Sequence, residues 1–261
     1  MRVGPRPVCQ TRPRMTPDAL VELFQRTAVA IRDSLLPVRG AERRARTTRP
    51  GQYAIDVIAD RAALEVLRRA PVAIVSEESG VHQVPGSEIT VVIDPVDGSS
   101  NAARDIPYWA TSLCALDTQG PLAALVVNQA TGSTSIATRG GGATRDGRSL
   151  ETSMATRVED AVVAISSFPG RMPTWKQFRA LGSCALALCD VAAGTFDGYL
   201  DGASVHAPWD YLGGLLVCAE AGASVIDVQG RPLVVMDPNA RRHLVAAGTP
   251  AMLDALRSVA G

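Results

Sequence analysis

The chain has 261 residues, of which 26 are basic and 26 acidic, so its formal net charge is zero. Such a balance creates no overall field that would draw the protein to nucleic acid or to a charged membrane. No apolar run approaches the ~20 residues that a membrane-spanning helix needs. We therefore expect a globular, cytoplasmic protein with one large core or two joined lobes, and with neither a nucleic-acid nor a membrane partner.

The chain begins with an arginine- and proline-rich segment, residues 1–15, which lacks the apolar stretch of a signal peptide. We predict a flexible tail there. Thr16 and Pro17 then have the features of a helix start, with a capping hydroxyl followed by a proline in the first turn. Because apolar residues recur at helical spacing from Leu20 to Ile31, a long N-terminal helix is expected to follow.

A dense basic run, Arg39 to Arg49, comes after this helix. It predicts either a mobile solvated loop or a flap over an anionic substrate. Two aspartates, Asp56 and Asp60, follow four residues apart, and the helical pattern continues from Arg61 to Arg69. Either aspartate could serve a nearby site.

Two apolar strands lead directly into acidic residues. Residues 73–76 precede Glu77 and its acidic neighbour, and residues 91–93 precede Asp94 and Asp97. Carboxylate and carbonyl oxygens suit hard divalent cations such as Mg²⁺. The alternative is an ordinary exit from a strand into a turn, where these residue types are common.

The second of these acidic runs also contains a glycine and two hydroxyl groups. Because the chain turns through Gly98, both carboxylates and the Val96 carbonyl can face one point. The backbone amides of Gly98, Ser99 and Ser100, if they open a helix, would form a partly positive cradle for a phosphate. Metal and phosphate would then share one pocket.

A third acidic position lies far along the chain. Pro208 and Trp209 bring Asp210 to the start of a helical pattern. Taken alone, Asp210 has the position of a helix cap, and Glu77 that of a solvated loop edge. Glu77, Asp94 and Asp210 lie in three segments far apart in sequence, each at the end of a strand or the start of a helix. This arrangement favours one shared metal site.

The remaining pattern predicts two lobes. Strands at 112–116, 122–128 and 134–138, joined by short connections, indicate an antiparallel sheet. Strands and helices then alternate at 162–166, 183–193, 198–200, 209–220 and 224–227, which favours an α/β arrangement. We predict an N-terminal lobe of residues 16–148 and a C-terminal lobe of residues 149–261, with the site in the cleft between them.

Three motifs, taken together, resemble those of a known family. They are Ser76-Glu77-Glu78-Ser79, the run from Asp94 to Asn101, and Trp209-Asp210 followed by Glu220-Ala221-Gly222. In order and spacing they resemble the inositol monophosphatase family of the Mg²⁺-dependent, lithium-sensitive phosphatase superfamily, over nearly the whole chain from about Thr16. The resemblance implies a two-lobed, layered α-β-α-β-α sugar-phosphatase fold with two or three Mg²⁺ ions per site.

The resemblance also implies the metal ligands. One Mg²⁺ ion would be held by Glu77, Asp94 and the Val96 carbonyl, and a second by Asp94, Asp97 and Asp210. Asp94 would therefore bridge the two ions. Paired ions of this kind suit in-line displacement at phosphorus by an activated water molecule.

The catalytic residues implied by the resemblance are Glu77, Ser99 and Asp60, with Asp56 as the competing candidate for the last. Ser99 takes the place of a threonine that positions the attacking water and is held by an upstream aspartate. It keeps the hydroxyl but loses the methyl group that restricts the rotamer. We expect slower or unchanged chemistry, and two further departures, Ser76 for glycine and Ala102 for an aromatic residue, remove no ligand.

Substrate hydroxyls are bound in the family by residues that correspond to Asp97, Ser183, Cys184 and Asp201, the last being shorter than the family's glutamate. Ser183 can equally be a helix cap. His206 is interpreted as a structural or rim residue, because metal ions already supply the hydroxide.

The resemblance implies hydrolysis of a small phosphate ester, first of all inositol 1-phosphate. Histidinol phosphate, fructose 1,6-bisphosphate and adenosine 3′,5′-bisphosphate are the alternatives, and a bisphosphate would need further arginines such as Arg104, Arg145 or Arg179 near the cleft. A hypothesis of another class is a binding protein of the transcription or RNA-processing machinery that retains the metal site. Family members are often homodimers, and the apolar content of 46% allows such an interface.

Overall fold

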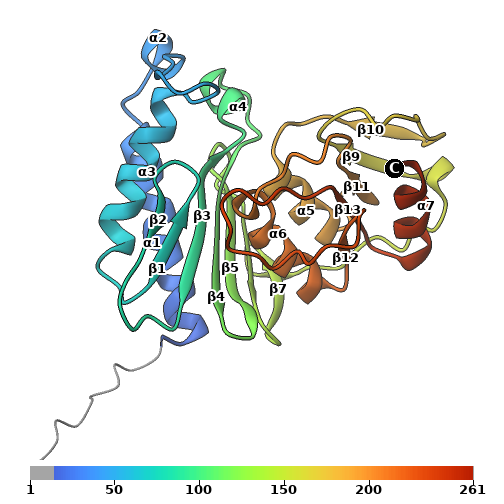
Figure 1. The fold of residues 1–261 in the computed structure, drawn as a ribbon. Coiled ribbons are helices and arrows are strands. Elements are labelled where there is room, and N and C mark those ends of the chain that lie inside the picture. The colour runs from blue at the N-terminus through green and yellow to red at the C-terminus, as the bar shows by residue number, and fades with distance from the viewer. Residues whose placement is uncertain (1–14, 261) are drawn as a thin grey trace, which may run out of the picture.

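The computed structural model describes residues 15–260, which form two β-sheets with helices between and outside them (Figure 1). The predicted tail lies outside the described residues except for Met15. The first sheet has eight strands in the order β2-β1-β3-β4-β5-β6-β7-β8, and the second has five in the order β10-β9-β11-β13-β12. Together with the helices they make the α-β-α-β-α layers that the resemblance implied.

The strands follow the predicted pattern closely along the middle of the chain. Those of the first sheet are β1 Ala73–Ser76, β2 Gly80–His82, β3 Thr90–Asp97, β4 Ala110–Asp117, β5 Gly120–Asn128, β6 Thr134–Thr138, β7 Gly142–Arg145 and β8 Arg148–Ser149. Those of the second are β9 Val162–Ile165, β10 Gln177–Arg179, β11 Gly198–Leu200, β12 Ser224–Asp227 and β13 Leu244–Ala247. The first sheet is antiparallel except where β1 pairs with β3.

The helices account for the other layers. They are α1 Pro17–Leu35, α2 Gly40–Arg43, α3 Ala54–Leu67, α4 Ser99–Ala103, α5 Cys184–Ala192, α6 Pro208–Ala221 and α7 Pro250–Ala260, with a short 3-10 turn at Val158–Asp160. None of the helices in the described part of the chain is both long and apolar enough to cross a membrane.

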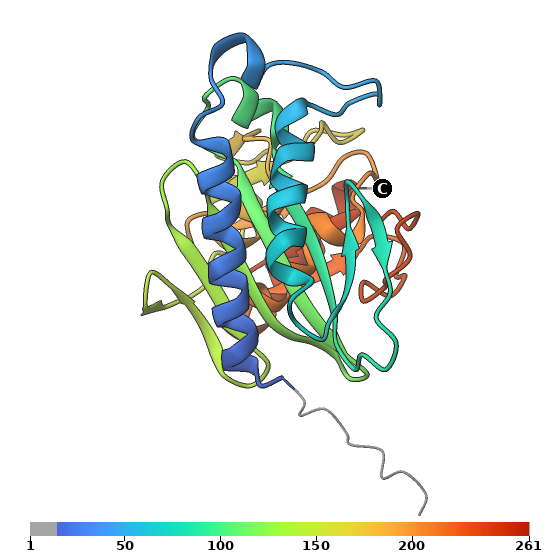
Figure 2. The ribbon, with the colours of Figure 1, turned by 90° about the vertical axis from the view of Figure 1, so that its left-hand side faces the viewer.

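The long N-terminal helix is confirmed, and so is its capping residue. The Thr16 hydroxyl accepts a hydrogen bond from the Ala19 amide at 3.2 Å. Helix α1 lies beside α3 on one face of the first sheet (Figure 2). Leu20, Phe24 and Ile31 are fully buried there. Because burial of each such side chain contributes about 1.5–3 kcal/mol, the docking of α1 on the sheet is strongly favourable.

The helix expected to run through Arg61 begins earlier, at Ala54. The Asp56 carboxylate accepts a hydrogen bond from the Tyr53 amide at 2.7 Å, and this bond caps the N-terminus of α3. Asp56 and Asp60 therefore lie on one helix, one turn apart, and both are buried.

Helices α5 and α6 lie between the two sheets (Figure 1). Leu188 of α5 and Leu212 and Val217 of α6 belong to the same buried cluster as Val92 and Val126 of the first sheet. Helix α7 covers the outer face of the second sheet. The two halves of the chain therefore share one core along the α5 and α6 layer.

Candidate active site

An irregularity in β3 decides where two acidic side chains point. Asp94 pairs with Ser112 and Asp97 with Ala110, so two residues of β3 oppose the single residue Thr111 of β4. In a regular strand, residues three apart face opposite sides of the sheet. The extra residue of the bulge cancels this alternation and turns both carboxylates to the same side. The Thr111 hydroxyl fixes the bulge by donating to the Pro95 carbonyl at 2.8 Å.

Three carboxylates from separate elements meet beside this bulge. One oxygen each of Glu77, Asp94 and Asp210 lies within 4.8 Å of the others, and we call this group the three-carboxylate cluster. Glu77 follows β1 directly, and its amide donates to the Ile93 carbonyl at 3.2 Å, which extends the β1 and β3 pairing. Asp210 lies in the first turn of α6 and accepts from the Ala207 amide at 2.7 Å.

The cluster carries more negative charge than its surroundings neutralise. Burial, followed by the charge of Asp210, raises the pKa of Glu77 to about 8. Burial and then the charge of Glu77 raise the pKa of Asp94 well above its usual range. Within residues 15–260 the cluster forms no ion pair with arginine or lysine, and only His206 is near, with Nδ1 3.5 Å from the Asp210 carboxylate. The donor set therefore fits a divalent cation, which could hold all three carboxylates ionised.

Asp97 lies outside the three-carboxylate cluster and faces α5. It accepts hydrogen bonds from the Ser183 hydroxyl at 2.6 Å and the Ala185 amide at 2.7 Å. Ser183 also caps α5, since its oxygen accepts from the Leu186 amide at 3.3 Å. Burial, followed by the charge of Asp210, raises the pKa of Asp97 to about 6. Asp97 thus joins the acidic site to the second half of the chain.

The predicted phosphate cradle coincides with the start of α4. Gly98 precedes the helix with φ of 90°, a conformation that favours glycine, and Ser99 and Ser100 form its first turn. The first amides of a helix have no acceptor within it. A Cβ atom on Gly98 would lie 2.9 Å from the Gly182 carbonyl oxygen. The chain therefore passes very close to the α5 loop here.

The two candidate aspartates on α3 have different surroundings. Asp60 accepts a hydrogen bond from the Ser76 hydroxyl at 2.5 Å, and the Ser76 oxygen also lies 3.3 Å from the Glu78 amide, which donates to it. Asp56 has one carboxylate oxygen without a hydrogen-bond partner among the described residues, and burial raises its pKa to about 7. Neither aspartate is bonded to Ser99. The unusual serine before the acidic pair was the signal that could have identified the bond between Ser76 and Asp60.

We expect the substitution Ser76→Ala to weaken Mg²⁺ binding. It leaves an oxygen of the buried Asp60 carboxylate without its donor and frees the turn that aims Glu77, at a cost of about 1–3 kcal/mol. The Mg²⁺ concentration for half-maximal phosphate release should rise roughly 3- to 10-fold. Ser258→Ala is the control, because the Ser258 hydroxyl donates to the Ala255 carbonyl on α7, away from the acidic site. An unchanged Mg²⁺ requirement in Ser76→Ala would contradict this role.

A pocket of about 290 Å³ opens beside the acidic site. Its polar lining includes Asp97, Ser183, Cys184, Tyr199, His206 and Asp210. Asp201, by contrast, is not among the lining residues. Its side chain is fully buried and accepts from the Ser166 hydroxyl at 2.8 Å and the Ala203 amide at 3.0 Å. His206 and Tyr199 both line the pocket, and the His206 Nε2 lies 2.6 Å from the Tyr199 hydroxyl.

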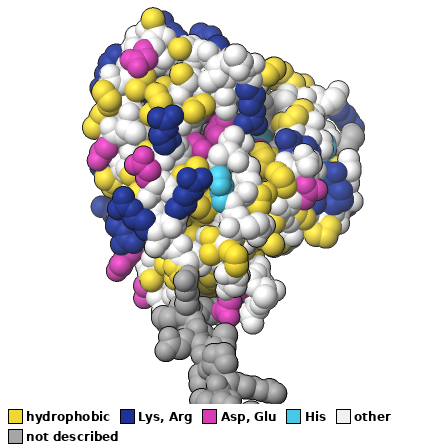
Figure 3. All heavy atoms as spheres, turned by 60° about the vertical axis from the view of Figure 1, so that its left-hand side comes forward, with side chains coloured by type: hydrophobic (Ala, Val, Ile, Leu, Met, Phe, Trp, Pro, Cys, Tyr) yellow, Lys and Arg dark blue, Asp and Glu magenta, His cyan; other side chains and the backbone are white. Residues whose placement is uncertain are grey.

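The basic residues singled out from the sequence lie in different places. Arg145 pairs with Asp190 at 2.8 Å, and Arg179 is exposed on β10. Arg43 is buried, and its Nε donates to the Ala102 carbonyl at 2.6 Å, so the basic segment is anchored to α4. On the face seen in Figure 3, basic and acidic side chains are interspersed.

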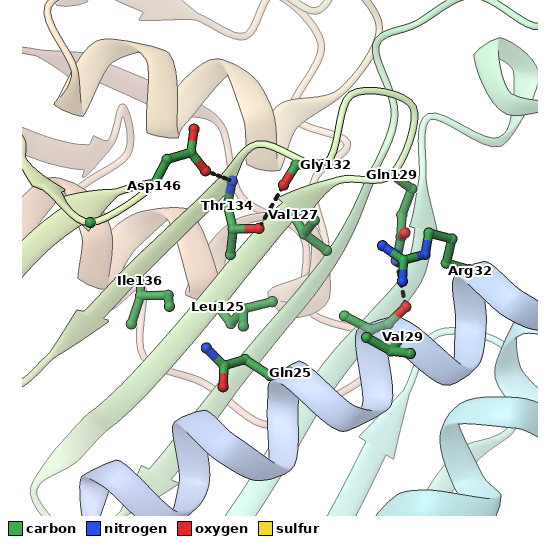
Figure 4. Close-up of a pocket in the computed structure, with 12 residues that line it drawn as sticks. Gln25, Val29, Arg32, Leu125, Val127, Gln129, Gly132, Thr134, Ile136 and Asp146 are labelled. Carbon is green, nitrogen blue, oxygen red and sulfur yellow. Dashed lines mark hydrogen bonds between the residues drawn. The ribbon is translucent and has the colours of Figure 1, made fainter.

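Another pocket, of about 300 Å³, lies between α1 and strands β5 and β6. Val29, Leu125 and Ile136 make much of its wall, and Asp146 turns away to accept from the Thr134 amide at 2.7 Å (Figure 4). None of the three clustered carboxylates lines it. It is therefore separate from the acidic site.

The acidic site should make stability depend on pH. A carboxyl group with a raised pKa binds more protons in the folded protein than in the unfolded chain, so metal-free stability falls as pH rises between the two pKa values. For Glu77 this window runs from its usual 4.5 to about 8. Mg²⁺ requires ionised ligands. Thermal unfolding should show a melting temperature that falls from pH 5 to 8 without metal, and a Mg²⁺-induced rise that is larger at pH 8. A metal-free melting temperature that is flat or rises would contradict this.

A carboxylate cluster at the ends of two strands and the start of a helix, beside the amides of α4 and a pocket, could hold a metal ion next to a phosphate group. A sequence model of the inositol monophosphatase family matches residues 19–258. The chain therefore belongs to the inositol monophosphatase family.

Known proteins agree with this assignment. The chain is 35% identical over 201 residues to a fructose-1,6-bisphosphatase/inositol-1-monophosphatase of Archaeoglobus fulgidus, a match that covers 74% of this chain and 78% of that protein. It is 29% identical over 219 residues to Nus factor SuhB of Salmonella typhimurium, with 77% and 79% covered. A Pyrococcus horikoshii protein with similarities to inositol-1 monophosphatase has the same fold, with a TM-score of 0.85 at 22% identity over 94% of this chain and 99% of that one.

Proposed function

We propose that the protein is a Mg²⁺-dependent phosphomonoesterase of small polyol and sugar phosphates, with inositol 1-phosphate as its first substrate. The observation that carries the proposal is the three-carboxylate cluster, in which Asp94 is buried and Glu77 and Asp210 are partly buried; the cluster is repulsive without a cation and lies beside a pocket for a small molecule. Fructose 1,6-bisphosphate is the second candidate, because a relative at 35% identity is named for both activities.

In this proposal Glu77, Asp94 and the Val96 carbonyl would hold one Mg²⁺ ion, and Asp94, Asp97 and Asp210 would hold another. When bound there, the ions would supply Lewis acidity toward the phosphoryl group and would lower the pKa of a water molecule. Oxygen donors of this kind are what Mg²⁺ prefers. The proximity of Glu77, Asp94 and Asp210 supports the assignment, and Asp97 is the ligand that would also touch the second half of the chain.

The chain's own groups then position the reactants. The amides of Gly98, Ser99 and Ser100 bind phosphate oxygens, and the Ser99 hydroxyl orients the attacking water. Asp60 acts through Ser76 on the turn that carries Glu77.

The alcohol leaving group occupies the adjacent pocket, where Ser183 and Cys184 contact its hydroxyl groups together with Asp97. Asp201 supports this pocket from behind through Ser166. His206 is the ring that shapes the pocket wall.

The test is phosphate release with and without Mg²⁺ from inositol 1-phosphate, fructose 1,6-bisphosphate, histidinol phosphate and adenosine 3′,5′-bisphosphate. Mg²⁺-dependent release with inositol 1-phosphate preferred would support the proposal. Preference for another ester would keep the reaction class and change the substrate. No release from any of them would overturn it and favour a binding role; relatives at 29% identity are named Nus factor SuhB.

A further inference from the structure

A third pocket, of about 360 Å³, lies where α1 ends, beside α2 and the segment that follows α4. Helices α2 and α4 lie at the same end of the molecule (Figure 1). Among the described residues, the charged side chains that line this pocket are Arg32, Arg39, Arg43 and Asp105. The three clustered carboxylates do not line it, and neither do the cradle residues 98–100. The pocket is therefore separate from the acidic site, and its wall carries net positive charge.

Arg43 is the buried member of the three arginines, and its position is fixed. Its Nε donates to the Ala102 carbonyl at 2.6 Å and lies 3.3 Å from the Asp105 carboxylate. Its guanidinium lies 5.7 Å from the centre of the Trp109 ring. The Asp105 side chain is 71% exposed, so water screens this ion pair and the pair offsets little of the charge on Arg43. A cation is therefore held against the wall of the pocket.

The other two arginines are exposed and weakly matched. Within residues 15–260, Arg39 forms no ion pair with a carboxylate, and its Nη1 donates to the Val38 carbonyl at 3.0 Å. Arg32 lies 3.7 Å from Asp33, and both of these side chains are about half exposed, so their attraction is small. Like charges that line one pocket repel one another. A bound anion would relieve this repulsion and accept charge-assisted hydrogen bonds.

Apolar side chains beside the arginines remain in contact with water. Leu36 is 55% exposed and Ile106 is 44% exposed, and both line the pocket together with Trp109. An inorganic anion would leave Leu36 and Ile106 exposed, whereas a ligand with an apolar group next to its charge would cover them, which is favourable. The volume of the pocket lies in the range of about 300–1,000 Å³ that is typical of small-molecule sites. The pocket therefore suits a small organic anion.

We propose that this pocket binds a small organic anion in which a phosphate, sulfate, sulfonate or carboxylate group is attached to a flat apolar group. The anionic group lies among Arg32, Arg39 and Arg43, and the apolar group covers Leu36 and Ile106. Arginine suits this task because its planar guanidinium can donate two parallel hydrogen bonds to such a group. Binding at this pocket does not depend on the proposed phosphatase function.

The test is a fluorescence titration with two probes that differ in charge. One is 8-anilinonaphthalene-1-sulfonate, and the other is N-phenyl-1-naphthylamine, which has the same rings without the sulfonate. EDTA is present, because metal-free carboxylates repel an anion from the acidic site. The sulfonate should bind with a Kd of roughly 10–100 μM, at least about tenfold more tightly than the amine. Equal affinities, or no saturable binding of the sulfonate below about 1 mM, would overturn the proposal.

Variants at exposed positions locate the binding. The double variant Arg32→Gln, Arg39→Gln should weaken sulfonate binding at least about tenfold and change amine binding less than about twofold. Ile106→Glu places a carboxylate in the pocket and should weaken sulfonate binding at least as much. Arg179→Gln is the matched control, because Arg179 lies beside the exposed Phe178 on β10, outside the pocket. Unchanged sulfonate affinity in the double variant, or an equal loss in Arg179→Gln, would refute the site.

Discussion

The substitution Asp94→Asn should abolish phosphate release while leaving the protein folded. Asp94 is the carboxylate proposed to bridge both metal ions, and metal ions contribute several kcal/mol to such reactions. At about 1.36 kcal/mol for each factor of ten, we expect kcat to fall on the order of 10³-fold or more. An assay of released phosphate at saturating Mg²⁺ measures this directly.

Although Asp94→Asn should lose activity, the metal-free variant should be more stable than the native protein. Burial and the charge of Glu77 oppose ionisation of Asp94, so a neutral amide removes repulsion from the metal-free site. The asparagine oxygen can still accept the bond from the Val96 amide, which is 2.9 Å long in the native protein. We expect a higher melting temperature than native in EDTA at pH 8, and no further rise with Mg²⁺. Asp160→Asn, which alters an exposed carboxylate, should behave as native. A variant that still gained stability from Mg²⁺ would contradict the role of Asp94.

The second large effect is expected for Gly98→Ala. A side chain at φ of 90° is strained by about 1–2 kcal/mol, and the new Cβ would press on the Gly182 carbonyl oxygen at 2.9 Å. With the cost of overpacking, unfolding free energy should fall by about 2–5 kcal/mol. The cradle amides would also shift, and a displacement near 1 Å can cost about 100-fold in rate.

A matched glycine separates the two causes. Gly86 has φ of 76°, but a Cβ there would meet no atom within 4 Å. Gly86→Ala should therefore show only the conformational cost, about 1–2 kcal/mol in a denaturant titration, and normal phosphate release. Equal destabilisation in both variants would mean that the contact between Gly98 and Gly182 has no energetic role.

The elements around the site could be predicted because their signals are local. Strand β1 and strand β3 are apolar runs that end at acids, and α6 starts where Pro208 precedes an aspartate. The bulge in β3 could not be predicted, since it depends on which residues of β4 pair with Asp94 and Asp97. The sequence showed the two carboxylates together but not the register that aims them.

Contacts between residues far apart in sequence could not be predicted either, because they too depend on how distant segments pack together. Asp56 and Asp60 lie one turn apart on α3, and helical periodicity cannot say which of them reaches Ser76 across 16 or 20 residues of chain. Asp201 does not line the pocket because its carboxylate is bonded to a hydroxyl group of the loop after β9. That loop is equally remote in sequence.

The buried layer of α5 and α6 has a consequence for how such a protein can evolve. Its side chains fill the space between two sheets that come from different halves of the chain. Neither half can be exchanged for an unrelated module by recombination, because each would lose the surface that covers its inner face. Insertions are expected instead in exposed connections, such as the one between β12 and β13, where Val234 and Met236 face solvent. New substrate specificities in this fold should therefore arise by changes in the loops, while the two sheets and the helices between them are kept.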